Sequence, residues 1–420
     1  MSVNLHTIIS KANVRENNNL KRDVTFIDSK ITSIQRWFPY LEGFAEDFVT
    51  NSIEHLKITP NYIYEPFSGS GTVPIYALKK RINCHYDEVN PFMVSLVDTK
   101  LKLIGLPLNV KQDICNKLSN ILINYRNVID CCEPSVILAK TYKDTFAPSI
   151  YFNDINFTVI LKSKTFLEKQ EGYVYELLNI AMCEALLPSS LLKRAGDIRF
   201  RKSLNEIKQI TNYIERSERN LRNILEDINE ILEYENDFKG ITYSLNAKKR
   251  KNDLINKIDF TFTSPPYLNG TNYIRNTKLE LWFSGKLKSK KDLSFYRQEV
   301  VTAGINDVTT EKKDMVIPFI EELLNDKTLW YDRRIPKMVR DYFYDMQIVF
   351  DNVFNYTSIG GYFCIDIGDS IYGGIHIPTD KIFLVMLKET NFKIEEVIKL
   401  RNRKSNDGSD LEQTLIICKK

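Results

Sequence analysis

The sequence predicts an α/β fold in which a parallel sheet is interrupted by a large, mainly helical insertion. Three observations lead to this prediction. From residue 61 to residue 91 the chain reads as a strand, a glycine-containing loop, a helix and a second strand, the order that opens a parallel α/β sheet. Between about 110 and 250, apolar residues recur at helical spacing. Short apolar strands then resume at 258–262 and 362–367, so the sheet is completed after the insertion.

Each element follows from a local pattern. Tyr62 to Tyr64 is a short aromatic and β-branched strand, Val73 to Lys80 has the spacing of a helix, and Ile82 to Tyr86 forms the next strand. A helix is also expected at about 380–389 and a last strand at 413–418. We therefore expect three segments: an N-terminal part of the core at 1–108, a helical insertion at 109–250 and a C-terminal part of the core at 251–420.

Composition excludes several classes of protein. With 43% hydrophobic and 27% charged residues, the chain resembles an ordinary globular protein with a sizeable core. No apolar stretch is long enough to cross a membrane and no secretion signal is visible, so a cytoplasmic location without membrane contact is expected. The seven cysteines are scattered and do not combine with the four histidines in a ligand spacing, so no metal and no disulfide framework are expected.

The loop between the first strand and helix has the composition of a cofactor site. Gly69 and Gly71 allow a ligand to approach the backbone closely, and the helix that follows favours a negative group at its N-terminus. Glu88 lies about twenty residues downstream at the end of the next strand, where a carboxylate can accept hydrogen bonds from two ribose hydroxyls. A tight turn with a surface acidic pair is the plainer interpretation, but the order of the elements favours a nucleotide-like cofactor.

A second site element, Ser264-Pro265-Pro266-Tyr267, follows the strand at 258–262 directly. An exocyclic amine of a base is a poor nucleophile, because its lone pair is delocalised into the ring. The Ser264 hydroxyl and the Pro265 carbonyl can accept the amino hydrogens, the prolines make the loop rigid, and the Tyr267 ring can stack on a base rotated out of the duplex. The alternative is a proline-rich turn or ligand segment, which belongs in an exposed linker rather than after a buried strand.

Together these motifs resemble the family of DNA amino-methyltransferases, which methylate cytosine at N4 or adenine at N6. The segments that carry the resemblance are the cofactor loop Phe67–Thr72, the acidic strand end Glu88–Pro91 and the catalytic loop Thr263–Tyr267; Arg36–Tyr40 and 360–370 are similar more weakly. Glutamate replaces the usual aspartate at Glu65 and Glu88. The resemblance implies S-adenosylmethionine as cofactor and a Rossmann-like class I methyltransferase sheet. It also implies catalytic residues at Ser264, Pro265, Pro266 and Tyr267, and cofactor-binding residues at Phe38, Pro39, Glu65, Phe67, Gly69, Gly71, Thr72, Glu88 and Asn90.

The resemblance also suggests a substrate. Serine at the head of the catalytic loop resembles the cytosine-N4 subgroup more than the adenine-N6 subgroup, and the motif order places a possible target-recognition lobe at 109–250. Carbon-5 methylation is disfavoured because no cysteine neighbours a proline. We therefore expect methylation of duplex DNA by base flipping, possibly beside a separate cognate restriction endonuclease acting on the same site. An RNA guanine N2-methyltransferase and a non-enzymatic adaptor that keeps the fold are the other hypotheses.

Basic residues indicate where DNA would bind. Lys193, Arg194, Arg199 and Arg201 form a cluster in the insertion, and a second run, Lys248 to Lys251, precedes the catalytic strand. Such clusters can neutralise backbone phosphates on either side of a flipped base, although a basic run is often only a solvated helix face. The segment at 286–340 is a further candidate for reading bases. The net charge of +4 decides nothing, because a local patch is sufficient to bind DNA.

Overall fold

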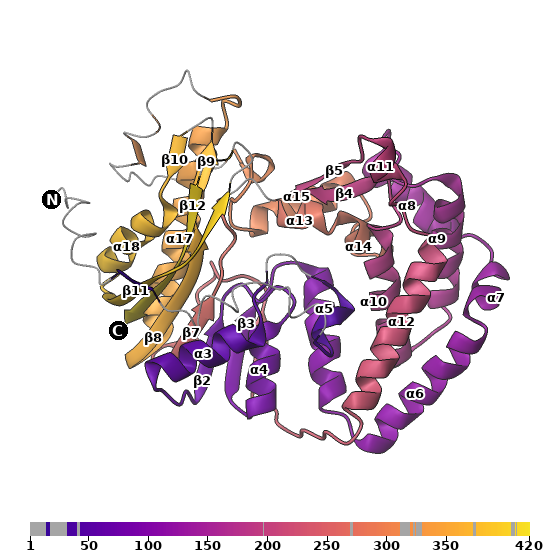
Figure 1. The fold of residues 1–420 in the computed structure, drawn as a ribbon, viewed down its shortest axis with the longest axis horizontal. Coiled ribbons are helices and arrows are strands. Elements are labelled where there is room, and N and C mark those ends of the chain that lie inside the picture. The colour runs from indigo at the N-terminus through magenta and orange to yellow at the C-terminus, as the bar shows by residue number, and fades with distance from the viewer. Residues whose placement is uncertain are drawn as a thin grey trace.

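The fold is known from a computed structural model, which describes residues 14–16, 32–39, 43–195, 197–268, 272–310, 320–321, 324, 330–372, 375–404, 408 and 410–420. Its central feature is an eight-stranded sheet on one side of the molecule, with a helical lobe on the other side (Figure 1). The prediction of an α/β fold is confirmed. Within the described ranges, none of the helices combines the length and the apolar character that crossing a bilayer requires.

All strands of the sheet except one run in the same direction. The order is β1 (Val14–Glu16), β11 (Lys393–Lys404), β12 (Asp410–Lys419), β8 (Thr357–Gly368), β7 (Ile258–Thr263), β2 (Tyr62–Glu65), β3 (Asn83–Asp87) and β6 (Ile241–Ser244). Only β12 pairs antiparallel with its two neighbours. Because β2 pairs with both β3 and β7, the segments that follow these three strands lie side by side at one edge of the sheet.

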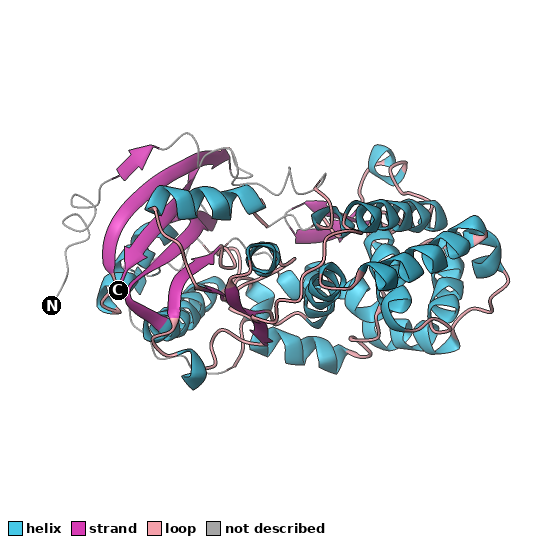
Figure 2. Ribbon diagram, turned by 90° about the horizontal axis from the view of Figure 1, so that it is seen from below, coloured by secondary structure: helices cyan, strands magenta, loops and turns pink. Residues whose placement is uncertain are grey.

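Helices cover both faces of the sheet. The helices α3 (Glu46–Leu56) and α4 (Thr72–Lys80) pack on one face, against strand residues such as Ile63 and Cys364. The helices α17 (Ile335–Tyr356) and α18 (Thr379–Glu389) pack on the other face, against Tyr64, which follows Ile63 in the chain, and Phe363, which precedes Cys364. Successive strand residues point to opposite faces, and both faces are buried, which explains why these strands read as continuous apolar runs. Figure 2 shows the sheet between its helical layers.

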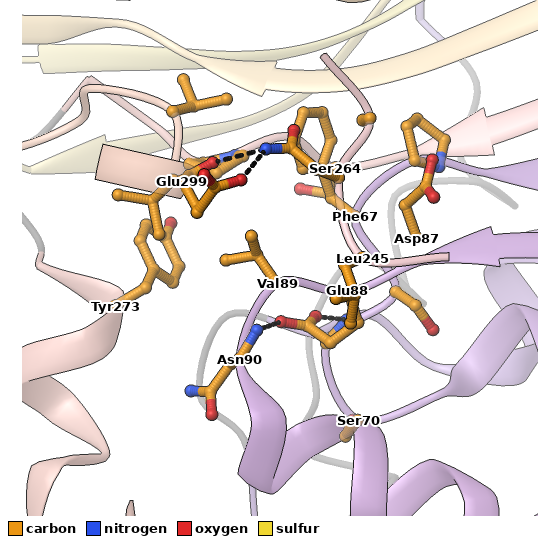
Figure 3. A pocket seen from close by; sticks show the side chains of 18 of the residues that line it. Phe67, Ser70, Asp87, Glu88, Val89, Asn90, Leu245, Ser264, Tyr273 and Glu299 are labelled. Carbon is orange, nitrogen blue, oxygen red and sulfur yellow. Dashed lines mark hydrogen bonds between the residues drawn. The ribbon is translucent and has the colours of Figure 1, made fainter. Parts of the chain in front are cut away.

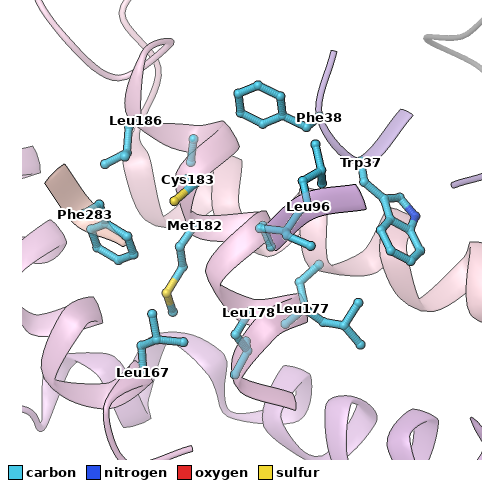
Figure 4. Packing of buried hydrophobic residues seen from close by; sticks show 14 of the residues in the cluster. Trp37, Phe38, Leu96, Leu167, Leu177, Leu178, Met182, Cys183, Leu186 and Phe283 are labelled. Carbon is cyan, nitrogen blue, oxygen red and sulfur yellow. The ribbon is translucent and has the colours of Figure 1, made fainter. Parts of the chain in front are cut away.

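The helical lobe packs around α10, whose fifteen residues include eleven buried ones (Figure 4). It contains α6 (Leu108–Ile123), α7 (Tyr125–Asp130), α8 (Val136–Phe146), α9 (Asp154–Leu167), α10 (Gly172–Leu186), α11 (Leu204–Ile207) and α12 (Tyr213–Glu230), with a hairpin of β4 (Leu192–Ala195) and β5 (Asp197–Phe200). The helix α5 (Pro91–Ile104) joins the lobe to the sheet and contributes to the same apolar cluster.

Two features of the lobe differ from the sequence prediction. The strand β6 lies at the sheet edge, although its residues fall inside the range 109–250 that the pattern assigned to the insertion. After β7, the helices α13 (Tyr273–Asn276), α14 (Lys278–Phe283) and α15 (Lys290–Glu299) return to the lobe. There Trp282 is fully buried and donates to the Leu138 carbonyl over 3.2 Å. One strand from within the insertion therefore belongs to the sheet, and helices that follow β7 belong to the lobe.

Candidate active site

A cavity of about 100 Å³, open to solvent, lies at the edge of the sheet where β2, β3, β6 and β7 end (Figure 3). Its lining comes from the loops after these four strands and from the region of α13 and α15. The strand-end residues are Pro66–Ser70 and Thr72, Asp87–Asn90, Leu245–Lys248, and Ser264 with Pro266; the others are Gly43, Phe44, Tyr273, Ile274 and 299–301. The predicted cofactor loop and the predicted catalytic loop, nearly two hundred residues apart in sequence, thus share one cavity.

Glu88 lines the cavity just after β3. Its carboxylate accepts the backbone N–H of Gly69 and the backbone N–H of Asn90, each over 2.8 Å. Asn90 in turn caps α5 by accepting the Phe92 N–H over 3.1 Å, so an Asn-Pro helix start fixes the acidic strand end. Burial raises the pKa of Glu88 to about 7. Carboxylate oxygens have further lone pairs, so Glu88 can accept additional hydrogen bonds from a ligand in the cavity.

Asp87, the neighbour of Glu88, serves a different purpose. Its carboxylate accepts hydrogen bonds from the Tyr64 and Ser244 hydroxyls and is paired with Lys251 over 2.9 Å. These contacts tie together the ends of β2, β3 and β6 and the segment that precedes β7. Although Asp87 lines the cavity, its oxygens are committed to the protein, so Glu88 is the better candidate to bind a ligand.

Glu65 lies beneath the cavity rather than in its wall. It is buried, and one carboxylate oxygen accepts the Phe67 N–H over 3.1 Å and the Thr263 hydroxyl over 2.5 Å. Burial raises the pKa of Glu65 well above its usual range. The residue therefore joins the predicted cofactor loop to β7, which precedes the predicted catalytic loop, and it is not among the residues that line the cavity.

The two loop glycines also have separate environments. Gly69 lines the cavity and has a φ of +52°, whereas Gly71 has a φ of +91° and lies against α5 instead. A Cβ atom on Gly71 would come within 2.8 Å of a methyl group of Val97. Gly71 is thus required by the backbone and by helix packing, and Thr72, which follows it, lines the cavity and donates to the Phe44 carbonyl over 3.2 Å.

The N-terminal segment with Phe38 and Pro39 is attached to the helical lobe. Asp227 of α12 accepts hydrogen bonds from the Ile34 N–H over 2.7 Å, from Arg36 Nε and from the indole of Trp37, both over 2.8 Å. Phe38 is buried against Phe92, with ring centroids 4.9 Å apart. Neither Phe38 nor Pro39 is among the residues that line the cavity, and Tyr40 lies outside the described residues.

The predicted catalytic loop is fixed by residues from two later strands. Asp366 of β8, fully enclosed, accepts hydrogen bonds from the Ser264 hydroxyl over 3.2 Å and from the Tyr267 hydroxyl over 3.0 Å. The Gln413 amide of β12 donates to Asp366 over 2.7 Å and to the Tyr267 hydroxyl over 2.9 Å. Burial raises the pKa of Asp366. No pattern in the sequence connects Asp366 or Gln413 to this loop, because each lies at least a hundred residues from Ser264.

The two proline carbonyls of this loop differ in their hydrogen bonding. The Pro266 carbonyl accepts the Tyr342 hydroxyl over 2.9 Å. The Pro265 carbonyl accepts no hydrogen bond from the residues that the structure describes, but Pro265 is buried and is not among the residues that line the cavity. Ser264 donates its proton to Asp366, so the free lone pairs of its oxygen can accept. Of the two predicted acceptors at the head of the loop, Ser264 therefore faces the cavity and Pro265 does not line it.

The predicted DNA-binding residues lie on the β4–β5 hairpin and just after it, and each has a protein partner or a buried group. Lys193 and Arg199 pair with Glu206, at 3.0 Å and 2.8 Å. Arg201 donates to the Glu206 carbonyl over 2.8 Å, and the Nε atom of Arg194 is buried. In the second basic run, Lys248 donates to the Val300 carbonyl, Lys249 pairs with Glu299 and Lys251 pairs with Asp87, so these three side chains are engaged within the protein.

Known proteins resemble the chain over almost all of its length. Two Type II methyltransferases named M.AvaI, from Nostoc sp. and from Anabaena variabilis, are each 24% identical over 438 residues, covering 93% of this chain and 86% of the relative. A Type II methyltransferase named M.BsoBI, from Geobacillus stearothermophilus, is 23% identical over 450 residues, covering 92% of this chain and 84% of the relative. No protein-family model and no solved structure matches the chain. The chain is thus a distant homologue of Type II methyltransferases.

Proposed function

We propose that the protein transfers a methyl group from S-adenosylmethionine to the exocyclic N4 amine of cytosine in duplex DNA, within a restriction-modification system and in the cytoplasm. The observation that carries the proposal is the single cavity lined both by the Gly69–Glu88 loop pair and by Ser264 and Pro266. The distant Type II methyltransferase homologues support the same reaction class. The one reversed strand, β12, supports a Rossmann-like class I methyltransferase sheet.

The cofactor side of the cavity has groups that suit S-adenosylmethionine. Glu88 is available to accept the ribose hydroxyls, while Ser68, whose buried hydroxyl has no hydrogen-bond partner among the described residues, can bind a polar group at the other end. Leu245 and Asn246, after β6, are available for the adenine ring. Bound there, the cofactor supplies an electrophilic methyl group. Glu65, Gly71 and the Phe38–Pro39 segment would support this site from behind rather than contact the ligand.

The catalytic side suits an amino group of a base. The Ser264 hydroxyl and the Pro265 carbonyl would accept the two amino hydrogens, which turns the nitrogen lone pair away from the ring and toward the methyl group. The proton that the amine loses would pass to the Ser264 hydroxyl, which donates its own proton to Asp366; burial raises the pKa of Asp366 and so favours its protonated form. Pro266 keeps the loop rigid, and Tyr267, held by Asp366 and Gln413, would stack on the flipped base.

A labelling experiment tests the proposal. The protein is incubated with methyl-labelled S-adenosylmethionine and, separately, with DNA from a methylation-free host and with RNA, and the products are digested to nucleosides. We expect the label in N4-methylcytosine. Label in N6-methyladenine would contradict the choice of base while keeping DNA methylation. Label only in N2-methylguanosine of RNA would overturn the DNA substrate, and a protein that binds no S-adenosylmethionine would be a non-enzymatic adaptor.

A further inference from the structure

Glu206, in the short helix α11, occupies a ring of hydrogen-bond donors on the surface of the helical lobe. Its carboxylate accepts two hydrogen bonds from the Arg199 guanidinium, at 2.8 and 3.0 Å, and one from Lys193 Nζ at 3.0 Å. The backbone N–H of Lys202 donates a fourth over 2.7 Å. Arg199, Lys202 and Lys193 hold the pKa of Glu206 far below its usual value, so an anion fills this ring at neutral pH. We call Lys193, Arg199 and the Lys202 N–H the anion cradle.

The donors of the anion cradle are those that bind phosphate oxygens. A guanidinium fork, an ammonium group and a backbone N–H are the usual protein partners of nucleic-acid phosphates. The cradle is also connected to the candidate active site. On the same hairpin, the Ile198 N–H donates to Asn276 over 3.1 Å and Asp197 pairs with Arg275 over 2.8 Å, both of them residues of α13. The first two residues of α13, Tyr273 and Ile274, line the cavity, and Figure 1 shows the hairpin next to this helix.

Glu206 can leave the cradle without unpacking the helical lobe. The four residues of α11 contribute no buried side chain, and its first residue, Leu204, is 76% exposed. The Glu206 side chain is partly buried, with 18% of its surface exposed, and a phosphate that replaced it would meet the same donors. The backbone of Glu206 need not move, because Arg201 holds its carbonyl over 2.8 Å and Ser203 accepts its N–H over 3.2 Å. Rotation of the Glu206 side chain alone would empty the cradle.

We propose that Glu206 is an internal substitute for a DNA phosphate: in the complex a backbone phosphate takes its place in the anion cradle, and the displaced carboxylate weakens binding to DNA that makes too few other contacts. The proposal rests on the proposed DNA substrate. It explains how the predicted phosphate-binding residues Lys193 and Arg199 can be paired in the free protein and still serve DNA. Their contribution to DNA affinity is reduced by one negative charge, which must be moved aside.

The test compares two substitutions that each remove one negative charge. E206Q empties the cradle of its anion, and the control E218Q changes Glu218, which pairs with Arg126 and Arg222 on the helical lobe. Binding of the full chain to a fluorescent duplex of unrelated sequence is followed by anisotropy between about 50 and about 200 mM KCl. We expect E206Q to bind at least about threefold more tightly at the lower salt concentration, with a salt slope steeper by about 1, and E218Q to match the unmodified protein.

Equal binding by E206Q and E218Q would overturn the proposal and leave Glu206 as a structural clamp of the hairpin. If circular dichroism shows that E206Q does not fold, R199Q carries the test: it should weaken binding and make the salt slope shallower by about 1, and unchanged binding would overturn the proposal. The proposed function fails separately, when the unmodified protein neither binds nor methylates duplex DNA. Normal DNA methylation together with identical E206Q and E218Q curves would refute only the role of Glu206.

Discussion

Replacing Gly71 by alanine is expected to destabilise the protein by about 2–5 kcal/mol. The backbone at Gly71 has a φ of +91°, which costs an L-residue about 1–2 kcal/mol. The added Cβ would also lie 2.8 Å from a Val97 methyl group in a packed interface, and such overpacking costs about 1–3 kcal/mol. Gly285→Ala is the matched control, because Gly285 has a φ of +74° and no atom within 4 Å of the added Cβ.

Urea unfolding measures both changes. Gly71→Ala should lower the free energy of unfolding by about 1–3 kcal/mol more than Gly285→Ala does, since only the first change adds a steric overlap. In a Val97→Ala background the extra cost should largely disappear, because the opposing methyl groups are gone. If Gly71→Ala costs no more than Gly285→Ala, or if Val97→Ala brings no relief, the assignment of Gly71 to helix packing is refuted.

Four further predictions concern the site. Tyr267→Ala should lose most methyl transfer but keep its affinity for S-adenosylmethionine in calorimetry, because Tyr267 is not among the residues that line the cavity; intact turnover would contradict its role. Asp366→Asn should slow single-turnover transfer about 10²–10⁴-fold, and a rate near that of the unmodified protein would exclude Asp366 as proton acceptor. Burial raises the pKa of Glu88 to about 7, and ribose hydroxyls donate to its charged form, so cofactor affinity should rise as the pH increases through about 7. Glu88→Gln should remove this pH dependence. An unchanged pH profile in Glu88→Gln would contradict the role of Glu88 in binding the ribose. Asp227→Ala leaves Arg36 and Trp37 without their buried acceptor, so it should lower the free energy of unfolding by about 3–5 kcal/mol. A change below about 1 kcal/mol in urea unfolding would show that other contacts hold the N-terminal segment.

The parts of the fold that the sequence predicted are those determined locally. The strands β2, β3 and β7 are short apolar runs, and each is followed directly by a loop with a recognisable composition. Parallel strands end at the same edge of a sheet, so placing Glu88 and Ser264 at strand ends was sufficient to place them close together. The strand β6 was missed because Ile241–Ser244 is only four residues long and follows a long run of helices.

The parts that were not predicted depend on contacts between distant segments. Asp366 and Gln413 reach Tyr267 only because β8 and β12 pair beside β7, which no spacing in the sequence reveals. The sequence shows where the basic residues lie along the chain, but their pairing with Glu206 and Asp87 decides how much charge they present to a ligand. Periodicity indicates which residues are buried, and it does not show which charged groups meet.

The central claim is that one cavity carries both the cofactor and the methyl transfer, and two substitutions test it most directly. S-adenosylmethionine binding by calorimetry and methyl transfer to DNA are measured for Glu88→Ala and for Ser264→Ala. The account predicts that Glu88→Ala loses cofactor binding, whereas Ser264→Ala binds the cofactor normally and loses most of the transfer. Normal cofactor affinity in Glu88→Ala, or undiminished transfer by Ser264→Ala, would contradict it.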